Sequence, residues 1–128
     1  MIDLHTHSHY SDGCDSPAQL VRQAQEAGLA AIALCDHNTL AGLPEFLEAG
    51  KKSPVKTVPG IELSTEHEGK ELHILALFLK QEHYGPIREL LGEYRRQKER
   101  SNRALVEALR QTGMELDYDR LARDKKDY

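Results

Sequence analysis

Residues 30–35 form a continuous apolar run, AAIALC, and the charged pair Asp36 and His37 follows it directly. A short apolar run without alternation is typical of a parallel β-strand that is buried on both faces. A charged pair at the end of such a strand is costly unless a neighbouring group uses its charges. Because parallel α/β folds place their chemistry at the carboxyl ends of strands, this segment predicts an α/β protein with a polar site there.

Strand-like and helix-like segments alternate along the first 80 or so residues, which predicts parallel pairing through crossover helices. Ser16, Pro17 and Gln19 have the spacing of an N-cap, a first helical residue and a capping-box partner. Gly28 ends this helix, and Pro59 with Gly60 interrupts the third strand. The expected strands are residues 2–4, 30–35, 55–58, 61–64 and 71–79, and the further expected helices cover residues 40–50 and about 86–112.

The bulk properties describe an ordinary globular chain with one core: 128 residues, 39% hydrophobic, with a formal net charge of -4. This charge argues against a protein that coats duplex nucleic acid, whereas a small anionic substrate is compatible with it if bound metal supplies positive charge. The basic stretch at residues 95–103 is interpreted as a solvated helix face rather than a phosphate site. No apolar run reaches the roughly 20 residues of a membrane span and no signal peptide is recognisable, so we expect a cytoplasmic protein without a membrane partner. Cys14 and Cys35 are expected to be reduced.

His5, His7 and Asp12 are the first candidate metal ligands. His5 and His7 are two residues apart, so on an extended backbone their imidazoles leave the same side and can converge on one ion. Two surface histidines explain an isolated pair equally well. Asp12 lies in a Ser-Asp-Gly turn, and a turn aspartate is the better interpretation of that residue alone.

Glu62 and His73 complete the candidate set. Both lie between apolar neighbours, so strand alternation points each of them opposite to those neighbours, although a satisfied core histidine explains His73 equally well. The six candidates together are His5, His7, Asp12, His37, Glu62 and His73, a set suited to Zn, Mn or Fe rather than Ca. Six ligands exceed the need of one tetrahedral ion, which favours two or more ions with Glu62 as the candidate bridge.

The same residues fall in four motifs: DLHTHS (3–8) with SDG (11–13), LCDHNT (34–39), VPGIELS (58–64) and HIL (73–75). In this order they resemble the PHP (polymerase and histidinol phosphatase) family, and within it the nucleoside 3',5'-bisphosphate phosphatases and 5'-to-3' exoribonucleases. The resemblance implies the N-terminal part of a distorted seven-stranded β/α barrel with two or three divalent ions (Mn, Zn or Fe). It also implies that His5, His7 and Glu62 hold one ion, that Glu62 bridges to a second bound by His73, and that Asp12 and His37 hold the third.

The activity that the resemblance implies is metal-dependent hydrolysis of a phosphate ester on a nucleotide or short RNA. Water activated by the metals would be the nucleophile, and no protein nucleophile is needed. Asp36 is expected either to orient a ligand histidine or to be an ordinary strand-end aspartate. No substrate-binding residue is identified, and His9, His67 and His83 match no motif position.

The sequence departs from the family pattern in lacking its later ligands, a mid-barrel histidine and a terminal Asp-x-His pair, since no histidine follows His83. Asn38 stands where relatives carry aspartate. We expect residues 1–84 to be the first part of the barrel and residues 85–128 to be a helical insertion-like segment. The alternative is a catalytically incomplete fragment that binds metal partially and forms homo-oligomers to cover its strand edges. A hydrolase of another ester or of an amide is the third hypothesis, because fold alone does not decide the chemistry.

Overall fold

The structure is a computed structural model that describes residues 1–123 of the chain. Its elements are β1 (Ile2–Thr6), α1 (Pro17–Glu26), β2 (Ala31–Leu34), α2 (Leu43–Gly50), β3 (Lys56–His67), β4 (Lys70–Leu77), the short 3-10 helix η1 (Gln81–His83), α3 (Tyr84–Gln111) and α4 (Tyr118–Ala122). The described residues fall into two compact units, 1–84 and 85–123. The order of the elements confirms the predicted α/β class.

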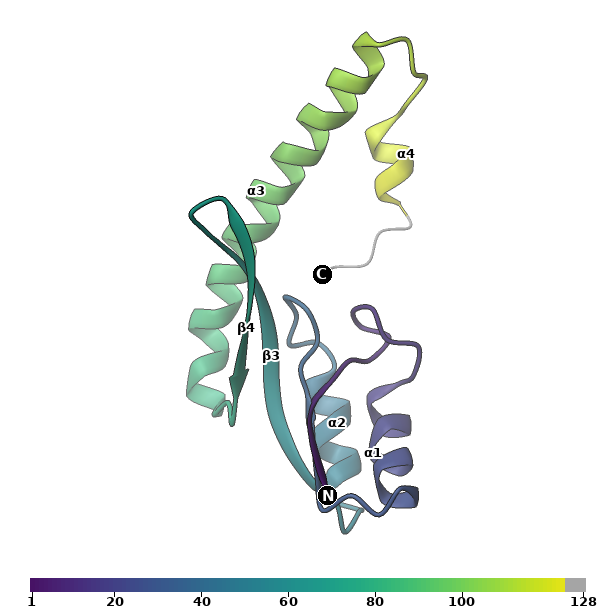
Figure 1. The fold of residues 1–128 in the computed structure, drawn as a ribbon, viewed down its shortest axis with the longest axis vertical. Helices are drawn as coiled ribbons and strands as arrows, with labels where there is room; N and C mark the ends of the chain where they lie inside the picture. The colour runs from purple at the N-terminus through teal and green to yellow at the C-terminus, as the bar shows by residue number, and fades with distance from the viewer. Residues whose placement is uncertain (124–128) are drawn as a thin grey trace. The chain divides into compact units, whose positions relative to one another are not determined.

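The first unit is built on a four-stranded sheet with the strand order β1-β2-β3-β4 (Figure 1). β1 pairs in parallel with β2, and β2 pairs in parallel with β3. The crossovers run through α1 and α2, which pack against each other beside the strands. β4 returns antiparallel to β3. Because the first three strands run the same way, their carboxyl ends open onto one edge of the sheet, as the sequence predicts.

The ends of α1 follow the predicted signals. The Ser16 hydroxyl accepts a hydrogen bond from the Gln19 backbone N–H at 3.2 Å, and the Gln19 side chain accepts one from the Ser16 N–H at 2.7 Å. This reciprocal capping box satisfies two N–H groups that a helix start leaves without partners. Gly28 follows the C-cap with φ +70°, a left-handed conformation that glycine adopts without strain.

The core lies between these two helices and the sheet. Phe46 of α2 is fully buried, and Val21 of α1 and Ile32 of β2 are 2% and 3% exposed. α2 begins at Leu43 rather than at the predicted Leu40, because Pro44 sits in its first turn, where proline is favoured. Leu40 remains buried just before the helix, so its apolar spacing reflects core packing and not helical backbone.

The predicted break in the third strand at Pro59 and Gly60 is wrong, since β3 runs without interruption from Lys56 to His67. Gly60 is needed for close approach instead of a turn. A Cβ atom there would lie 2.9 Å from Cys35 Sγ and 3.0 Å from the Ala76 carbonyl oxygen. β3 therefore joins the parallel strands and the β4 hairpin within one sheet.

The long helix predicted for about residues 86–112 forms as one continuous helix, α3. α4 is capped by Asp117, whose carboxylate accepts from the backbone N–H groups of Asp119 and Arg120 at 2.9 and 3.2 Å. Arg103 of α3 bonds both Glu99 and Asp119, at 3.1 and 3.0 Å, which ties α4 to α3. Within residues 1–123, none of the helices combines the length and apolar character that crossing a membrane requires. Residues 124–128 of the expected second segment lie outside the described residues.

Candidate metal centre

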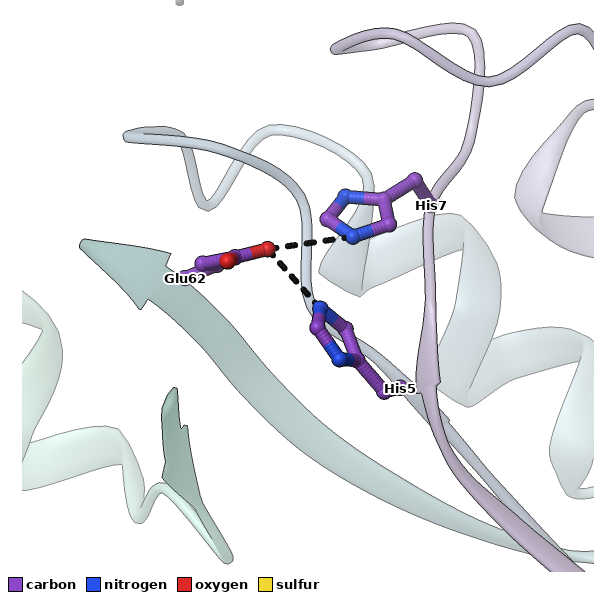
Figure 2. Close-up of side chains that lie close together, drawn as sticks. All are labelled: His5, His7 and Glu62. Atoms are coloured by element: carbon purple, nitrogen blue, oxygen red, sulfur yellow. Dashed lines mark hydrogen bonds and ion pairs between the residues drawn. The ribbon is translucent and has the colours of Figure 1, made fainter. Parts of the chain in front are cut away.

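Glu62 is the centre of the predicted ligand set. Its Oε2 atom lies 2.8 Å from His5 Nε2, 3.1 Å from His7 Nε2 and 3.6 Å from His37 Nε2. Its Oε1 atom lies 3.0 Å from His73 Nδ1. Figure 2 shows His5 of β1 and His7, just beyond the end of β1, pointing toward the Glu62 carboxylate on β3. One carboxylate is therefore surrounded by four imidazoles that come from three segments: the end of β1, the residues after β2, and β4.

Backbone hydrogen bonds just beyond the end of β2 explain why Glu62 lies beside His37. Beyond the last residue of β2, the Glu62 N–H donates to the Asp36 carbonyl at 3.2 Å, and the Asn38 N–H donates to the Glu62 carbonyl at 2.9 Å. This continuation of the parallel ladder places His37 beside Glu62. The Glu62 side chain is 6% exposed, so its charge is held where protein groups replace most of its water.

A second group forms where the loop after β1 meets the end of β2. Asp12 Oδ1 lies 3.4 Å from His7 Nδ1, and Asp12 Oδ2 lies 3.5 Å from His37 Nε2. The His7 and His37 rings are stacked, with their centroids 4.7 Å apart. The turn that carries Asp12 depends on Gly13, where a Cβ atom would lie only 2.2 Å from the His7 carbonyl oxygen. Glycine at this position thus lets the loop fold back over the first strand's end.

His7 provides the observation that tests whether this group fits a metal. Its Nδ1 atom is buried and makes no hydrogen bond with any of the described residues. Burial lowers the pKa of His7, against an opposing effect of Asp12, which favours a neutral ring with one N–H and one lone pair. If Nε2–H donates to Glu62, the Nδ1 lone pair faces the Asp12 carboxylate. Two acceptors that face each other, one of them buried, are suited to a cation between them.

His73 reaches the cluster from the β3–β4 hairpin, not from the carboxyl end of a parallel strand. It lies within β4, paired with Ser64 of β3, and Glu62 likewise lies within β3. The predicted placement of the polar site at the carboxyl ends of parallel strands is therefore wrong for these two residues. Strand alternation correctly predicts that they face the site.

Asp36 fixes the loop that carries Asp12. Its Oδ1 accepts from the Ser8 N–H and the Ser11 hydroxyl, and its Oδ2 accepts from the Ser8 hydroxyl, all at 2.7 Å. Ser8 and Ser11 are fully buried and Asp36 is 2% exposed. The carboxylate thus joins the ends of β1 and β2 instead of contacting an imidazole. The sequence analysis did not identify either serine. The available signal was that Asp36, after a buried strand, needs hydrogen-bond donors, and that Ser8 lies within the histidine-rich stretch and Ser11 just after it.

Asn38 is also explained by its surroundings. Its side-chain oxygen accepts from the Ser64 N–H at 3.0 Å, and its NH₂ donates to the Ser64 hydroxyl at 3.1 Å. Its φ of 51° is in the left-handed region, which asparagine tolerates better than most residues. The side chain therefore fastens the end of β2 to β3.

Burial, hydrogen bonds and neighbouring charges shift the pKa values of Glu62, His73 and Cys35. Burial would raise the pKa of Glu62, but the hydrogen bond with His5 and the charges of His37, His5 and His7 outweigh it and lower that pKa. The pKa of His73 is raised, first by its hydrogen bond with Glu71 and also by Glu62. Burial, Glu62 and Asp36 raise the pKa of the nearby Cys35 thiol to about 12, so it is no candidate nucleophile at neutral pH.

All six predicted residues meet in one region. They form three overlapping groups whose ligand atoms lie within 4.8 Å of one another: His5 with His7 and Glu62, His7 with Asp12 and His37, and His37 with Glu62 and His73. Imidazole nitrogens mixed with carboxylate oxygens suit Zn, Mn or Fe. The shared members would bring neighbouring ions close together.

Comparison with known proteins agrees with this geometry. Residues 3–123 match the family model described as the PHP domain. The chain belongs to the PHP domain family. The resemblance inferred from the four sequence motifs is thereby confirmed.

Curated relatives of this PHP chain include enzymes that act on different phosphate esters. It is 36% identical over 117 residues to a 5'-3' exoribonuclease of Haemophilus influenzae, which covers 91% of the chain and 42% of the relative. It is 33% identical over 120 residues to a phosphoribosyl 1,2-cyclic phosphate 1,2-diphosphodiesterase of Eggerthella lenta, covering 92% and 45%. The chain thus spans less than half the length of these relatives.

Solved structures place the PHP chain in the same architecture. A Bifidobacterium adolescentis protein assigned as a metal-dependent phosphoesterase superimposes with a TM-score of 0.71 at 30% identity, covering 92% of the chain and 41% of that protein. An amidohydrolase of Chromobacterium violaceum, solved with bound sulfate and no metal, gives 0.77 at 26% identity, covering 98% and 45%. These likenesses confirm that the sheet and its helices form part of a β/α barrel.

Proposed function

We propose that this chain contributes to a PHP metal centre of two or three divalent ions that hydrolyses a phosphate ester. His5, His7 and Glu62 would hold one ion, Glu62 with His73 and His37 a second, and His7 with Asp12 and His37 a third. The observation that carries the proposal is the buried Nδ1 of His7, which faces Asp12 without a hydrogen bond. Such an atom is costly to bury unless a cation uses its lone pair.

The chain's own residues would act by holding and orienting. When bound, divalent ions would supply a nucleophile from water at neutral pH and would neutralise phosphate oxygens. Burial lowers the pKa of His7, which favours the neutral ring that coordination requires. Asp36 keeps Asp12 in reach through Ser8 and Ser11. Cys35 stays a neutral thiol, which agrees with a mechanism that needs no protein nucleophile.

The substrate we propose is a nucleotide or the end of a short RNA. The 36% identity to an exoribonuclease supports a phosphodiester or phosphomonoester of a nucleotide. The diphosphodiesterase relative supports phosphate ester chemistry in general, and the sulfate bound in the Chromobacterium protein is a tetrahedral anion with the shape of phosphate. The formal net charge of -4 agrees with a small substrate rather than with duplex nucleic acid.

Hydrolysis of an amide or another ester is the second candidate, because one of the structural neighbours is described as an amidohydrolase. Metal-activated water can attack a carbonyl as well as a phosphorus atom. The two candidates differ in the substrate that turns over, so one panel of substrates separates them.

We further propose that residues 1–84 hold the whole candidate centre and that residues 85–128 are an insertion without a metal ligand. The six candidate ligands all lie within the first compact unit, which supports this division. Replacing residues 86–112 with a short linker should then leave zinc stoichiometry unchanged, and loss of an ion would contradict the division.

The test begins with metal binding. The chain, stripped by a chelator, is titrated with Zn²⁺ and Mn²⁺, and the bound ions are counted by elemental analysis. A nucleoside 3',5'-bisphosphate, a 5'-phosphorylated oligoribonucleotide, a lactone and a cyclic amide are then offered to the loaded protein. We expect at least two ions and turnover of a phosphate substrate only. Binding without turnover favours the incomplete fragment, turnover of the amide or lactone alone favours the second candidate, and no bound ion refutes the proposal.

A further inference from the structure

Glu71 lies on the far side of the His73 ring from the candidate centre. His73 Nδ1 is 3.0 Å from Glu62 Oε1, and His73 Nε2 is 3.0 Å from Glu71 Oε1. Glu71 and His73 are two residues apart in β4, so their side chains leave the same face of the strand. The imidazole is therefore held between two carboxylates, one inside the centre and one outside it.

A histidine that binds a metal must present a lone pair to the ion, so its other nitrogen carries the hydrogen. In proteins this second N–H usually donates to a carboxylate or carbonyl, which fixes both the tautomer and the ring orientation. Here Nδ1 faces the centre and Nε2 faces Glu71. An acceptor at Nε2 thus selects the tautomer in which Nδ1 is free to coordinate.

The position of Glu71 in the hairpin makes this contact more than a chance surface pair. Glu71 lies directly opposite Glu66 in the β3–β4 ladder, and both are exposed. Like charges that face each other across a strand pair are unfavourable, so β4 carries an acidic residue where the ladder itself disfavours one. The contact with His73 is a favourable interaction that offsets this repulsion.

We propose that Glu71 is a positioning residue of the metal centre, which holds His73 in the Nε2–H tautomer and aims its Nδ1 atom at the ion shared with Glu62. This inference rests on the proposed function and adds to it a residue outside the ligand set. In this role Glu71 would not contact the ion and would act only through His73.

The experiment measures Zn²⁺ affinity of the chain by competition with a chromophoric chelator. His73→Ala first identifies the binding step that needs His73. Glu71→Val removes the acceptor, Glu71→Gln removes the charge but keeps an oxygen acceptor, and Glu66→Val removes a matched charge from the opposite strand. The Glu71 side chain is 75% exposed, so these substitutions leave the core untouched. The second readout is the ¹⁵N chemical shifts of the His73 ring in the zinc-loaded protein, which report the tautomer independently of any activity.

Loss of a carboxylate that hydrogen-bonds a metal ligand typically weakens metal binding about 10- to 100-fold. Because Glu71 is exposed, we expect Glu71→Val to weaken Zn²⁺ affinity about tenfold, and only in the binding step that needs His73. Glu71→Gln should recover most of this loss, and Glu66→Val should change the affinity less than twofold, roughly the size of a screened surface charge effect. Wild-type protein should show hydrogen on Nε2 and zinc on Nδ1.

Equal affinities for Glu71→Val and Glu66→Val, or zinc on Nε2 in the wild type, would overturn the inference while leaving the proposed function intact. Failure of the wild-type chain to bind zinc at all would refute both.

Discussion

The parallel strands and the β3–β4 hairpin both bring histidines to the centre, but they hold them differently. At the ends of β1 and β2, the carboxylate of Asp36 and the hydroxyls of Ser8 and Ser11 form a buried polar scaffold. His37 above it is 16% exposed, whereas His73 of the hairpin is 40% exposed. Substitutions in the parallel part should therefore change folding and metal binding together, whereas those in the hairpin should change metal binding alone.

Glu62→Gln should have the largest effect, because this carboxylate belongs to two of the three candidate groups and contacts all four imidazoles. The amide has one oxygen acceptor and no charge, so it can neither bridge two ions nor neutralise them. We expect Zn²⁺ affinity to fall at least about 100-fold. That is the upper end of the loss seen when a group that only hydrogen-bonds a ligand is removed, and Glu62 is itself a candidate ligand. Chelator competition measures it. Unchanged affinity would mean that the strands and the hairpin do not share a centre.

Asp36→Ala should destabilise the fold and the metal site together. It removes the acceptor of the Ser8 N–H and of the buried Ser8 hydroxyl, and one acceptor of the buried Ser11 hydroxyl. Hydrogen bonds to charged groups contribute about 1.5–3 kcal/mol each, and partial relaxation keeps the total near the size of one or two of them, about 3 kcal/mol. Urea unfolding measures the change.

The matched control for Asp36→Ala is Ser8→Ala, which removes one of the three contacts and should cost about 1–2 kcal/mol. If Asp36→Ala left the free energy of unfolding unchanged, the buried scaffold would not be what stabilises the parallel part.

Gly60→Ala tests the place where the two regions meet. Its new Cβ would lie 2.9 Å from Cys35 Sγ of the parallel part and 3.0 Å from the Ala76 carbonyl of the hairpin. Overpacking of this kind costs about 1–3 kcal/mol. Gly92→Ala, in helix α3 with ample space, is the control and should be neutral or stabilising by up to about 1 kcal/mol. Equal stability of the two variants in thermal unfolding would show that β3 and β4 do not approach so closely.

His73→Ala should have the smallest effect on folding. The side chain is 40% exposed on a hairpin, and substitutions at such sites usually change stability by less than about 0.5 kcal/mol. One bound ion should nevertheless be lost, which elemental analysis of the zinc-loaded protein detects. A large fall in the free energy of unfolding, with the number of bound zinc ions unchanged, would contradict the proposed difference between the parallel strands and the hairpin.

Local signals in the sequence predicted much of this architecture. The capping box at Ser16 and Gln19 and the apolar run at residues 30–35 correctly indicated α1 and β2. The break at Pro59 and Gly60 was wrong because proline and glycine are also used where another backbone comes close, which is a property of the tertiary structure. The local sequence around Gly60 does not indicate that β4 pairs with β3 at this position.

The candidate ligands could be predicted as residues, but their grouping could not. His5 and His7 share a strand face by spacing alone, whereas the contact of Asp12 with His37 depends on a loop fold set by Gly13 and Asp36. The contact between Glu71 and His73 was also missed, although their spacing of two in a predicted strand was a signal for it.

The central claim is that side chains from the ends of β1 and β2, from β3 and from β4 gather around shared divalent cations. Crystals of the chain soaked in Mn²⁺ or Zn²⁺ and measured at the absorption edge of the metal test it most directly. We expect anomalous peaks beside Glu62, one bordered by His5 and His7 and another by His73. Peaks only at remote surface carboxylates, or none in crystals where the six side chains are ordered, would contradict the account.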